Sequence, residues 1–330
     1  MRGFAFHAGA ALLALACLAM PDRAARAQTD PVAAYPKQTI KLVVGFAAGG
    51  GNDIIARIVG QKLQDELGQT VIIENKVGAG GSLAALSVMM APADGYTLLI
   101  GASGAMSIIP AISVKPPYDT LKEFAPISNI ASFPLILSIY PSHPARTVLE
   151  LVAWMKANPD KANYATASSA FTLATELFKL RTGAPATAIP YKSSNESLVS
   201  VIAKQSLFTI ADPPPTTPQV KGGQVRALGV TADKRLDDLP DVPTMAEAGV
   251  PDLVVGLWSG LFAPAATPPG IVKKLETAMQ KIMQMPDVKE KFRAMATPTV
   301  GSSAAEFAHT IATETKMWSD VGRQANVRLE

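Results

Sequence analysis

The pattern that most constrains this fold is an alternation of short apolar strands with helices, joined by glycine-rich links. Thr39–Phe46 is typical of a buried strand and leads into a glycine triplet at residues 49–51. A helical apolar pattern follows, which Gly68 can end. Further strands are predicted at Thr70–Ile73 and Tyr96–Ile100. Strands that alternate with helices over short links predict an α/β fold with a parallel sheet, whose loops at the carboxyl edge bind ligands.

The middle third of the chain repeats this pattern, so two similar lobes are expected. Its strands are predicted at Leu135–Tyr140, Asn163–Ala167, Leu207–Ala211 and Val225–Thr231. Capping boxes, in which a Ser or Thr pairs with a Glu three residues later, predict helix starts at Thr147, Ser193, Thr244 and Ser303. An extended segment at 256–263 and a helical tail at about 268–325 complete the chain. We therefore predict lobe 1 at residues 28–132 and 256–330, and lobe 2 at residues 133–255.

The first 27 residues have the pattern of a cleavable secretory signal peptide. Arg2 gives a positive start, residues 4–20 are apolar, and the small residues of Ala25-Arg26-Ala27 precede Gln28. The alternatives are a membrane anchor or, with Cys17 in a lipobox, a lipoprotein. Small alanines in the apolar run favour cleavage after Ala27, and no later stretch approaches the ~18 apolar residues of a membrane span. We expect a soluble periplasmic protein.

Cysteine and histidine are too scarce for several kinds of chemistry. The only cysteine is Cys17, inside the predicted leader, and outside it the only histidines are His143 and His309. These counts argue against disulfides, thiolate chemistry and histidine metal clusters. No GxSxG motif of serine hydrolases occurs. The net charge is only +3, so the charge of the chain gives no reason to expect nucleic-acid binding. We expect no cofactor, no metal and no nucleic-acid partner.

The loop from Phe46 to Asp53 is the strongest candidate for ligand binding. Its glycines let the backbone approach a ligand, and the helix start behind them offers free N–H groups at the positive end of the helix dipole. The alternative is a tight turn in which Asn52 or Asp53 only caps the helix. Neither a Walker motif nor a GxGxxG pattern is present. The candidates in this loop are Phe46, Ala47, Ala48, Gly50, Gly51, Asn52 and Asp53.

Other candidate residues, most of them polar, follow strands at the predicted cleft, with helix capping or a plain loop as the alternative for each. These candidates are Ala102, Ser103, Ser168, Ser169 and Asp212. A second group is expected mainly to cap helices or, for the tryptophan, to pack where the chain crosses between lobes. Its members are Ser82, Ser193 and Trp258.

Ordered sequence blocks along the chain resemble a known family. They are VVGFAAGGGNDIIAR, ENKVGAGGSLA, PADGYTLLIG, PYDTLKEFAPIS, IPYKS, KGGQVRALGVTADKR, LPDVPTMAEAGV and GLFAPAATP. In this order they are similar to the Bug-type extracytoplasmic solute receptors of the tripartite tricarboxylate transporter family, from about Tyr35 to Glu330. The resemblance implies an α/β, two-lobed periplasmic binding protein (type II-like, of the Venus flytrap kind), with doubly wound, mostly parallel sheets.

The resemblance also implies how a ligand is held. In relatives, the loops that correspond to Phe46–Asp53 and Gly101–Gly104 hold a carboxylate through N–H groups and ordered waters, and the second lobe selects the rest of the ligand. Asp212 stands at its usual place. The second lobe departs from the family pattern at 166–172, where Phe171-Thr172 replaces a common Pro-His pair, and at Tyr191-Lys-Ser-Ser194. Phe171 could pack against an aromatic ligand, so ligand identity stays open.

The resulting hypothesis is a periplasmic receptor that binds a small mono- or dicarboxylate for the membrane subunits of a tripartite tricarboxylate-type transporter. It implies a monomer with no catalytic residues. Two alternatives remain at this stage. The chain could be an extracytoplasmic hydrolase of a carboxylate ester or amide, or a binding protein that serves a sensor rather than a transporter.

Overall fold

The structure is a computed structural model that describes residues 32 and 34–324 of the 330-residue chain. Residues 36–330 form a compact unit separate from residues 1–35, and both lobes belong to this unit. The predicted signal peptide and its cleavage site lie outside the described residues. None of the described helices combines the length and the apolar character that a membrane span requires.

The first lobe is built on a five-stranded sheet with the order β2-β1-β3-β10-β4. Its strands are β1 (Ile40–Val44), β2 (Val71–Asn75), β3 (Thr97–Ala102), β4 (Phe124–Pro134) and β10 (Gly256–Pro264). Strand β1 runs parallel to β2 and β3, so the glycine-rich loops that follow them, at residues 49–51, 78–81 and 101–104, lie at the same sheet edge. Strand β10 is antiparallel to both β3 and β4.

The second lobe is built on another five-stranded sheet, with the order β7-β6-β8-β5-β9. Its strands are β5 (Ile136–Ile139), β6 (Asn163–Thr166), β7 (Thr187–Pro190), β8 (Phe208–Ala211) and β9 (Arg226–Val230). Strand β6 is parallel to β7 and β8, whereas β5 is antiparallel to β8 and β9. The two-lobed α/β fold is confirmed, and both sheets are mixed rather than mostly parallel.

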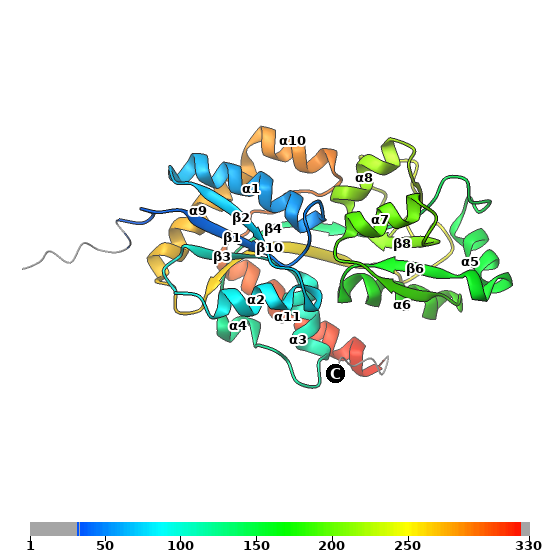
Figure 1. Cartoon of the computed structure of the whole chain (residues 1–330), viewed down its shortest axis with the longest axis horizontal. Coiled ribbons are helices and arrows are strands. Elements are labelled where there is room, and N and C mark those ends of the chain that lie inside the picture. Colours follow the sequence, from blue (N-terminus) through cyan, green and yellow to red (C-terminus); the bar gives the residue numbers. More distant parts are fainter. Residues whose placement is uncertain (1–31, 33, 325–330) are drawn as a thin grey trace, which may run out of the picture. The chain divides into compact units, whose positions relative to one another are not determined.

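Helices cover both faces of each sheet (Figure 1). Those of the first lobe are α1 (Gly51–Leu67), α2 (Ser82–Met89), α3 (Ile109–Ile112), α4 (Thr120–Glu123), α9 (Pro269–Gln284), α10 (Pro286–Ala294) and α11 (Ala304–Gln324). Those of the second lobe are α5 (Val148–Ala157), α6 (Ser169–Thr182), α7 (Ser194–Ile202) and α8 (Pro213–Lys221). In the first lobe α1 lies on one face of the sheet, and α2 and α11 lie on the other.

The chain passes between the sheets at two antiparallel strands. Strand β4 ends at Pro134 and β5 begins at Ile136, while β10 carries the chain back from Gly256. Gly256 pairs with Pro134, so the two crossings lie side by side. The lobe boundaries given above stay a prediction, because a sheet assignment fixes strands and not the limits of lobes.

Aromatic side chains fill the core of the first lobe beside these crossings. The Trp258 and Phe307 rings meet edge to face with centroids 4.9 Å apart, and the Phe262 ring lies 5.0 Å from that of Phe307. Such pairs stabilise a core beyond the area that they bury. Trp258 is 1% exposed, so the prediction that it packs at a crossover is confirmed.

Two local predictions are wrong, and helix α8 was not predicted. The capping box at Thr244 forms, since Glu247 N–H donates to Thr244 Oγ1 at 3.1 Å, but a turn follows in place of a helix. Ser82 does not cap α2: the N-cap is Gly81, and Ser82 Oγ instead accepts from the Tyr118 hydroxyl. The proline run after Asp212 is the first turn of α8, because proline fits the start of a helix, where N–H groups lack partners anyway.

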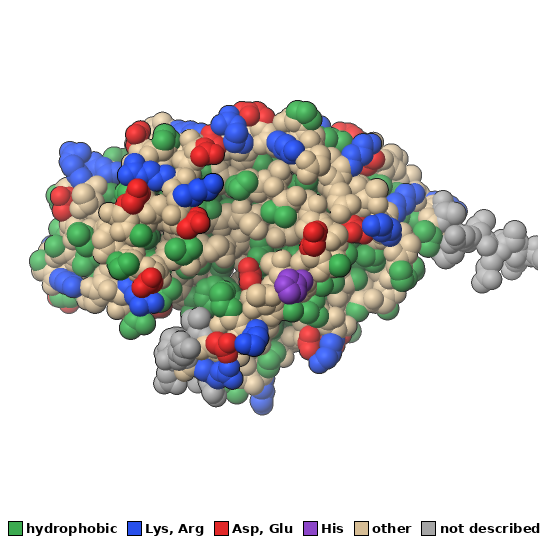
Figure 2. Space-filling view, turned by 180° about the vertical axis from the view of Figure 1, so that it is seen from behind, with side chains coloured by type: hydrophobic (Ala, Val, Ile, Leu, Met, Phe, Trp, Pro, Cys, Tyr) green, Lys and Arg blue, Asp and Glu red, His purple; other side chains and the backbone are tan. Residues whose placement is uncertain are grey.

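The surface carries both charge signs intermixed. On the face shown in Figure 2, Lys and Arg side chains alternate with Asp and Glu, and no single-sign field covers either lobe. Several described ion pairs join exposed residues three or four positions apart, such as Lys122 with Asp119 and Arg293 with Glu290. Pairs of this kind keep a protein soluble and contribute little to its stability.

Candidate functional site

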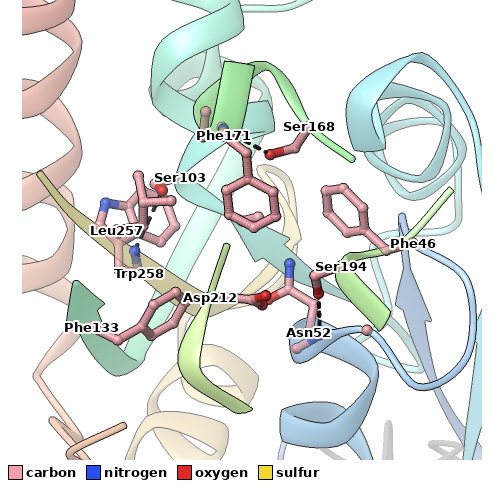
Figure 3. A pocket seen from close by; sticks show the side chains of 15 residues that line it. Phe46, Asn52, Ser103, Phe133, Ser168, Phe171, Ser194, Asp212, Leu257 and Trp258 are labelled. Carbon is pink, nitrogen blue, oxygen red and sulfur yellow. Dashed lines mark hydrogen bonds between the residues drawn. The ribbon is translucent and has the colours of Figure 1, made fainter. Parts of the chain in front are cut away.

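A small cavity lies between the lobes, where the N-terminal ends of four helices meet (Figure 3). About 30 Å³ of it is open to the centre of a water molecule. The ends of α1, α6, α7 and α8 supply part of the wall, and the loop after β3 and the crossing strands supply the rest. The lining residues are Phe46, Gly50, Gly51, Asn52, Ala102, Ser103, Gly104, Phe133, Ser168, Ala170, Phe171, Ser194, Asp212, Leu257 and Trp258.

The Phe46–Asp53 loop is held in shape by one buried carboxylate. Gly49 has φ +81°, a conformation that favours glycine, and its N–H donates to Asp53 Oδ2 at 2.9 Å. Arg57 donates to both Asp53 oxygens, at 2.8 and 3.0 Å, and Asn75 Nδ2 donates to Oδ1 at 2.9 Å. Burial alone would raise the pKa of Asp53, but these hydrogen bonds and the Arg57 charge hold it below its ordinary value.

The same loop is bonded to the second lobe through its backbone. Ala47 N–H donates to the Lys192 carbonyl at 3.2 Å, and Gly51 N–H donates to Ser194 Oγ at 3.3 Å. Gly51 also has no space for a side chain, because a Cβ there would collide with the Asp212 carboxylate. The glycine triplet therefore serves close approach between two parts of the protein as well as any approach to a ligand.

Helix caps position the second-lobe side of the cavity. Ser168 Oγ accepts from Phe171 N–H at 3.3 Å and begins α6, and Ser193 Oγ accepts from Glu196 N–H at 3.2 Å and begins α7. The capping prediction for Ser193 is confirmed, and Ser168 also caps its helix, which was the alternative to ligand binding for that residue. These caps place Phe171 and Ser194 in the first turns of their helices, where both line the cavity.

Asp212 follows β8 at the start of α8 and faces the cavity. It is 5% exposed, and burial raises its pKa to about 6, although a hydrogen bond with Ser194 lowers it in part. Its Oδ1 atom has no hydrogen-bond partner among the described residues. A buried polar atom without a partner is uncommon in proteins and calls for a physical reason.

Strand β10 closes the back of the cavity. Trp258 N–H donates to Ser103 Oγ at 3.4 Å, and the Ser259 hydroxyl donates to Asn52 Oδ1. The Trp258 indole N–H donates to Glu314 Oε2 at 2.6 Å, outside the cavity, and burial raises the pKa of Glu314 to about 7. These bonds tie the starts of α1 and of the loop after β3 to one strand.

The structure brings together nine of the thirteen candidate residues from the sequence. Those that line the cavity are Phe46, Gly50, Gly51, Asn52, Ala102, Ser103, Ser168, Phe171 and Asp212. Four candidates lie outside its lining. Ala48 is exposed, Ala47 and Asp53 are bonded as described above, and Ser169 lies behind Gly104, with its hydroxyl buried and unpartnered. Whether each residue contacts a ligand stays a prediction.

Gly104 lies in the predicted Gly101–Gly104 loop, and sequence reasoning did not select five other lining residues as ligand contacts. They are Phe133, Ala170, Ser194, Leu257 and Trp258. Leu257 pairs with Phe133 across the two crossing strands, so the predicted crossovers were the available signal for an apolar wall. The signal for Ser194 was its position directly after the Ser193 cap.

The electrostatics of the cavity come from backbone and one carboxylate. Among its described lining residues none is Lys or Arg, and Asp212 is the only ionisable side chain. Four helix N-termini converge there. Those of α1, α6 and α7 present N–H groups with partial positive charge, whereas α8 begins with three prolines. Such a site attracts an anion without a cationic side chain. Among the described residues no cluster of three or more His, Cys, Asp or Glu could hold a metal ion.

Comparison with known proteins gives a consistent result. Residues 55–327 match the family model described as tripartite tricarboxylate transporter family receptor. Protein BugT of Bordetella pertussis is 34% identical over 309 residues, which cover 91% of this chain and 94% of that protein.

Two solved structures of similar proteins contain ligands. Rpa4515 of R. palustris with adipate has a TM-score of 0.85 and 33% identity, covering 88% of this chain and 98% of that one. MatC of Rhodopseudomonas palustris with bound malate has a TM-score of 0.83 and 30% identity, covering 87% and 99%. These matches confirm the fold class and the family expected from the sequence.

Proposed function

Since this chain belongs to the tripartite tricarboxylate transporter receptor family, we propose that it captures a small carboxylate in the cavity between its lobes. Receptors of this family are periplasmic solute-binding proteins and not a class of enzymes. That membership removes the support for the hydrolase alternative. The activity proposed is binding, with the lobes held around the ligand.

The observation that carries this proposal is the meeting of four helix N-termini around a cavity without a Lys or Arg side chain among its described lining residues. The first N–H groups of a helix have no acceptor within the helix, so those of Asn52 and Asp53 can donate outward. A carboxylate satisfies such donors and is stabilised by the dipoles behind them. The ligands of the similar proteins, adipate and malate, are carboxylates of this kind.

Each wall of the cavity has a proposed role. The Phe46–Asp53 loop and the Ala102–Ser103 loop would hold the carboxylate, as expected for the family. Ser168, Ser169, Phe171 and Asp212 would select the rest of the ligand. The Phe171 ring is 8% exposed and lies beside the apolar wall of Phe133 and Leu257. That wall suits the carbon skeleton of the ligand.

The partner and the location are also proposals. The receptor would pass its ligand to the membrane subunits of a tripartite tricarboxylate-type transporter, after export and cleavage of the leader behind Ala27. It would act as a monomer. A role for a sensor in place of a transporter would use the same cavity.

Thermal denaturation with a panel of carboxylates tests the proposal. A ligand that binds only the folded state contributes about 2.7 kcal/mol at 100 times its Kd. For a protein of this size that amounts to a rise in Tm of roughly 5–10 °C. Native mass spectrometry should recover the same compound, chemically unchanged. If a sugar or a nucleotide raises Tm while no mono- or dicarboxylate does so, the proposal is wrong.

A matched pair of variants locates the binding site. Gly51→Val should abolish carboxylate binding, because the new side chain meets the Asp212 carboxylate and separates the two walls. Gly256→Val is the control, since a side chain there meets no atom within 4 Å. Unchanged affinity in folded Gly51→Val would place the ligand elsewhere.

A further inference from the structure

We infer that Asp212 accepts a hydrogen bond from the ligand and restricts the site to carboxylates that also carry a hydroxyl or an ammonium group. This inference rests on the proposed function and names the ligand class of the same cavity.

The residues after Asp212 prevent it from capping its own helix. An N-cap side chain accepts from the N–H of the second or third residue of the helix. In α4, α5, α6 and α7 the N-cap residue does so, always with the third residue. In α8 the first three positions are Pro213, Pro214 and Pro215, which have no N–H, and Asp212 makes no side-chain cap bond. The sequence thus places a carboxylate at a helix start where the N–H groups that usually donate to an N-cap side chain are absent.

The surroundings of Asp212 leave one acceptor open toward the cavity. The side chain is 5% exposed, and Ser194 is hydrogen-bonded to the carboxylate. Ser194 in turn accepts from Gly51 N–H. Oδ2 occupies the space that a Cβ of Gly51 would need, while Oδ1 has no partner among the described residues. A donor on the ligand would complete this arrangement.

The negative charge of Asp212 also favours a ligand that carries a hydrogen-bond donor. The ligand carboxylate would be held at the helix N-termini beside Asp212, and no described lining residue is cationic. Two carboxylates side by side repel each other unless a donor lies between them. A hydroxyl or an ammonium group close to the ligand carboxylate supplies that donor. An acid without one would leave Asp212 unpaired next to a like charge.

The test compares acids that differ by one donor. Calorimetry at pH 7.5 on the purified protein would use lactate with propionate, malate with succinate, and aspartate with succinate. For the pair that fits the cavity, the donor-bearing acid should bind more tightly by about tenfold or more, since a polar site rejects analogues that lack its partner group. Asp212→Asn should reduce that preference to less than about threefold, because the ionic acceptor is lost.

Two further variants make the result specific. Asp160→Asn removes the same charge from an exposed site in the second lobe and should keep the preference. Pro215→Ala returns an N–H at the third position of α8, so Asp212 can cap its helix, and the preference should fall while the carboxylate remains. Circular dichroism and Tm show that each variant is folded.

The outcomes separate this inference from the proposed function. If carboxylates bind without preference for a donor, or if the preference survives in Asp212→Asn and Pro215→Ala, the inference is wrong and the receptor proposal stands. It is also wrong if succinate binds tightly to both the unmodified protein and Asp212→Asn. That result would mean that Asp212 is protonated and donates a hydrogen bond to a second carboxylate of the ligand, as an amide can also do. If no carboxylate binds at all, the proposed function itself fails.

Discussion

Asp53 and Asp212 are both buried, and they face opposite conditions. Asp53 accepts four hydrogen bonds, from Gly49, Asn75 and twice from Arg57, and its pKa is lowered. Asp212 has a Ser194 hydroxyl and one open oxygen, and burial raises its pKa to about 6. The first carboxylate stabilises the loop that forms one wall of the cavity. The second is a cost to the folded protein that a ligand can offset.

The two carboxylates therefore differ in role: Asp53 stabilises the loop, and Asp212 is proposed to bind the ligand. A buried carboxylate whose oxygens have hydrogen-bond partners stabilises the backbone around it and has no free acceptor for a ligand. An unsatisfied one weakens the free protein and strengthens the complex, as is common where stability is given up for binding. Substitutions at Asp53, Asp212 and Ser194 test this distinction.

Asp53→Asn should destabilise the protein the most. The variant weakens the hydrogen bonds that the buried Asp53 carboxylate accepts from Gly49 and from the exposed Arg57, which costs about 2–4 kcal/mol. Urea denaturation measures this change, and Tm should fall by roughly 5–15 °C. Asp160→Asn, at an exposed position, is the control. A change below about 0.5 kcal/mol would show that Asp53 does not organise the loop.

Asp212→Asn should have the opposite sign in the absence of ligand. The variant no longer buries a charge at pH 7.5, so the free energy of unfolding should rise by about 1–2 kcal/mol. Tm should then rise by roughly 2–8 °C. A less stable variant would mean that Asp212 is satisfied in the free protein.

The pH dependence distinguishes the two residues by window. The raised pKa of Asp212 means that its proton stabilises the folded state, so the deficit relative to Asp212→Asn is present above about pH 6 and disappears as pH falls toward 4. The lowered pKa of Asp53 means that its contribution is present at neutral pH and is lost only below about pH 4. Urea denaturation of the three proteins between pH 3 and 8 measures both windows. Coincident windows would contradict the contrast.

Ser194→Ala should give the smallest change. It removes the hydrogen bond that lowers the pKa of Asp212, so that pKa should rise further, and stability at pH 7.5 should change by about 1 kcal/mol or less. Carbon-detected NMR titration of the Asp212 carboxyl measures the shift. An unchanged pKa would remove Ser194 from the description of the site.

The sequence allowed prediction of whatever depends on neighbours along the chain. The strand before Phe46, the glycine triplet and the caps at Ser168 and Ser193 are local, and the structure contains all of them. Strand order and the contact of Phe133 with the cavity depend on how the crossing strands pair, which no local pattern reports.

Helix α8 shows why a local pattern can also mislead. Three successive prolines usually indicate an extended segment, yet the first turn of a helix needs no N–H donors and accepts them. The same property that hid the helix from sequence analysis leaves Asp212 without a cap. Asp212 was predicted from the sequence as a site residue, but the missing cap bond that leaves its carboxylate open was not predicted.

Helix α8 also touches the first lobe at its far end. Thr217 Oγ1 donates to the Met295 carbonyl at 3.1 Å, and Lys221 Nζ donates to the Ala294 carbonyl at 3.4 Å. One short helix therefore joins the cavity to a seam on the outside of the protein. The chain has no cysteine beyond Cys17, so a single thiol at position 221 would be unique after loss of the leader. A dye attached there would show whether this seam changes when a carboxylate is added.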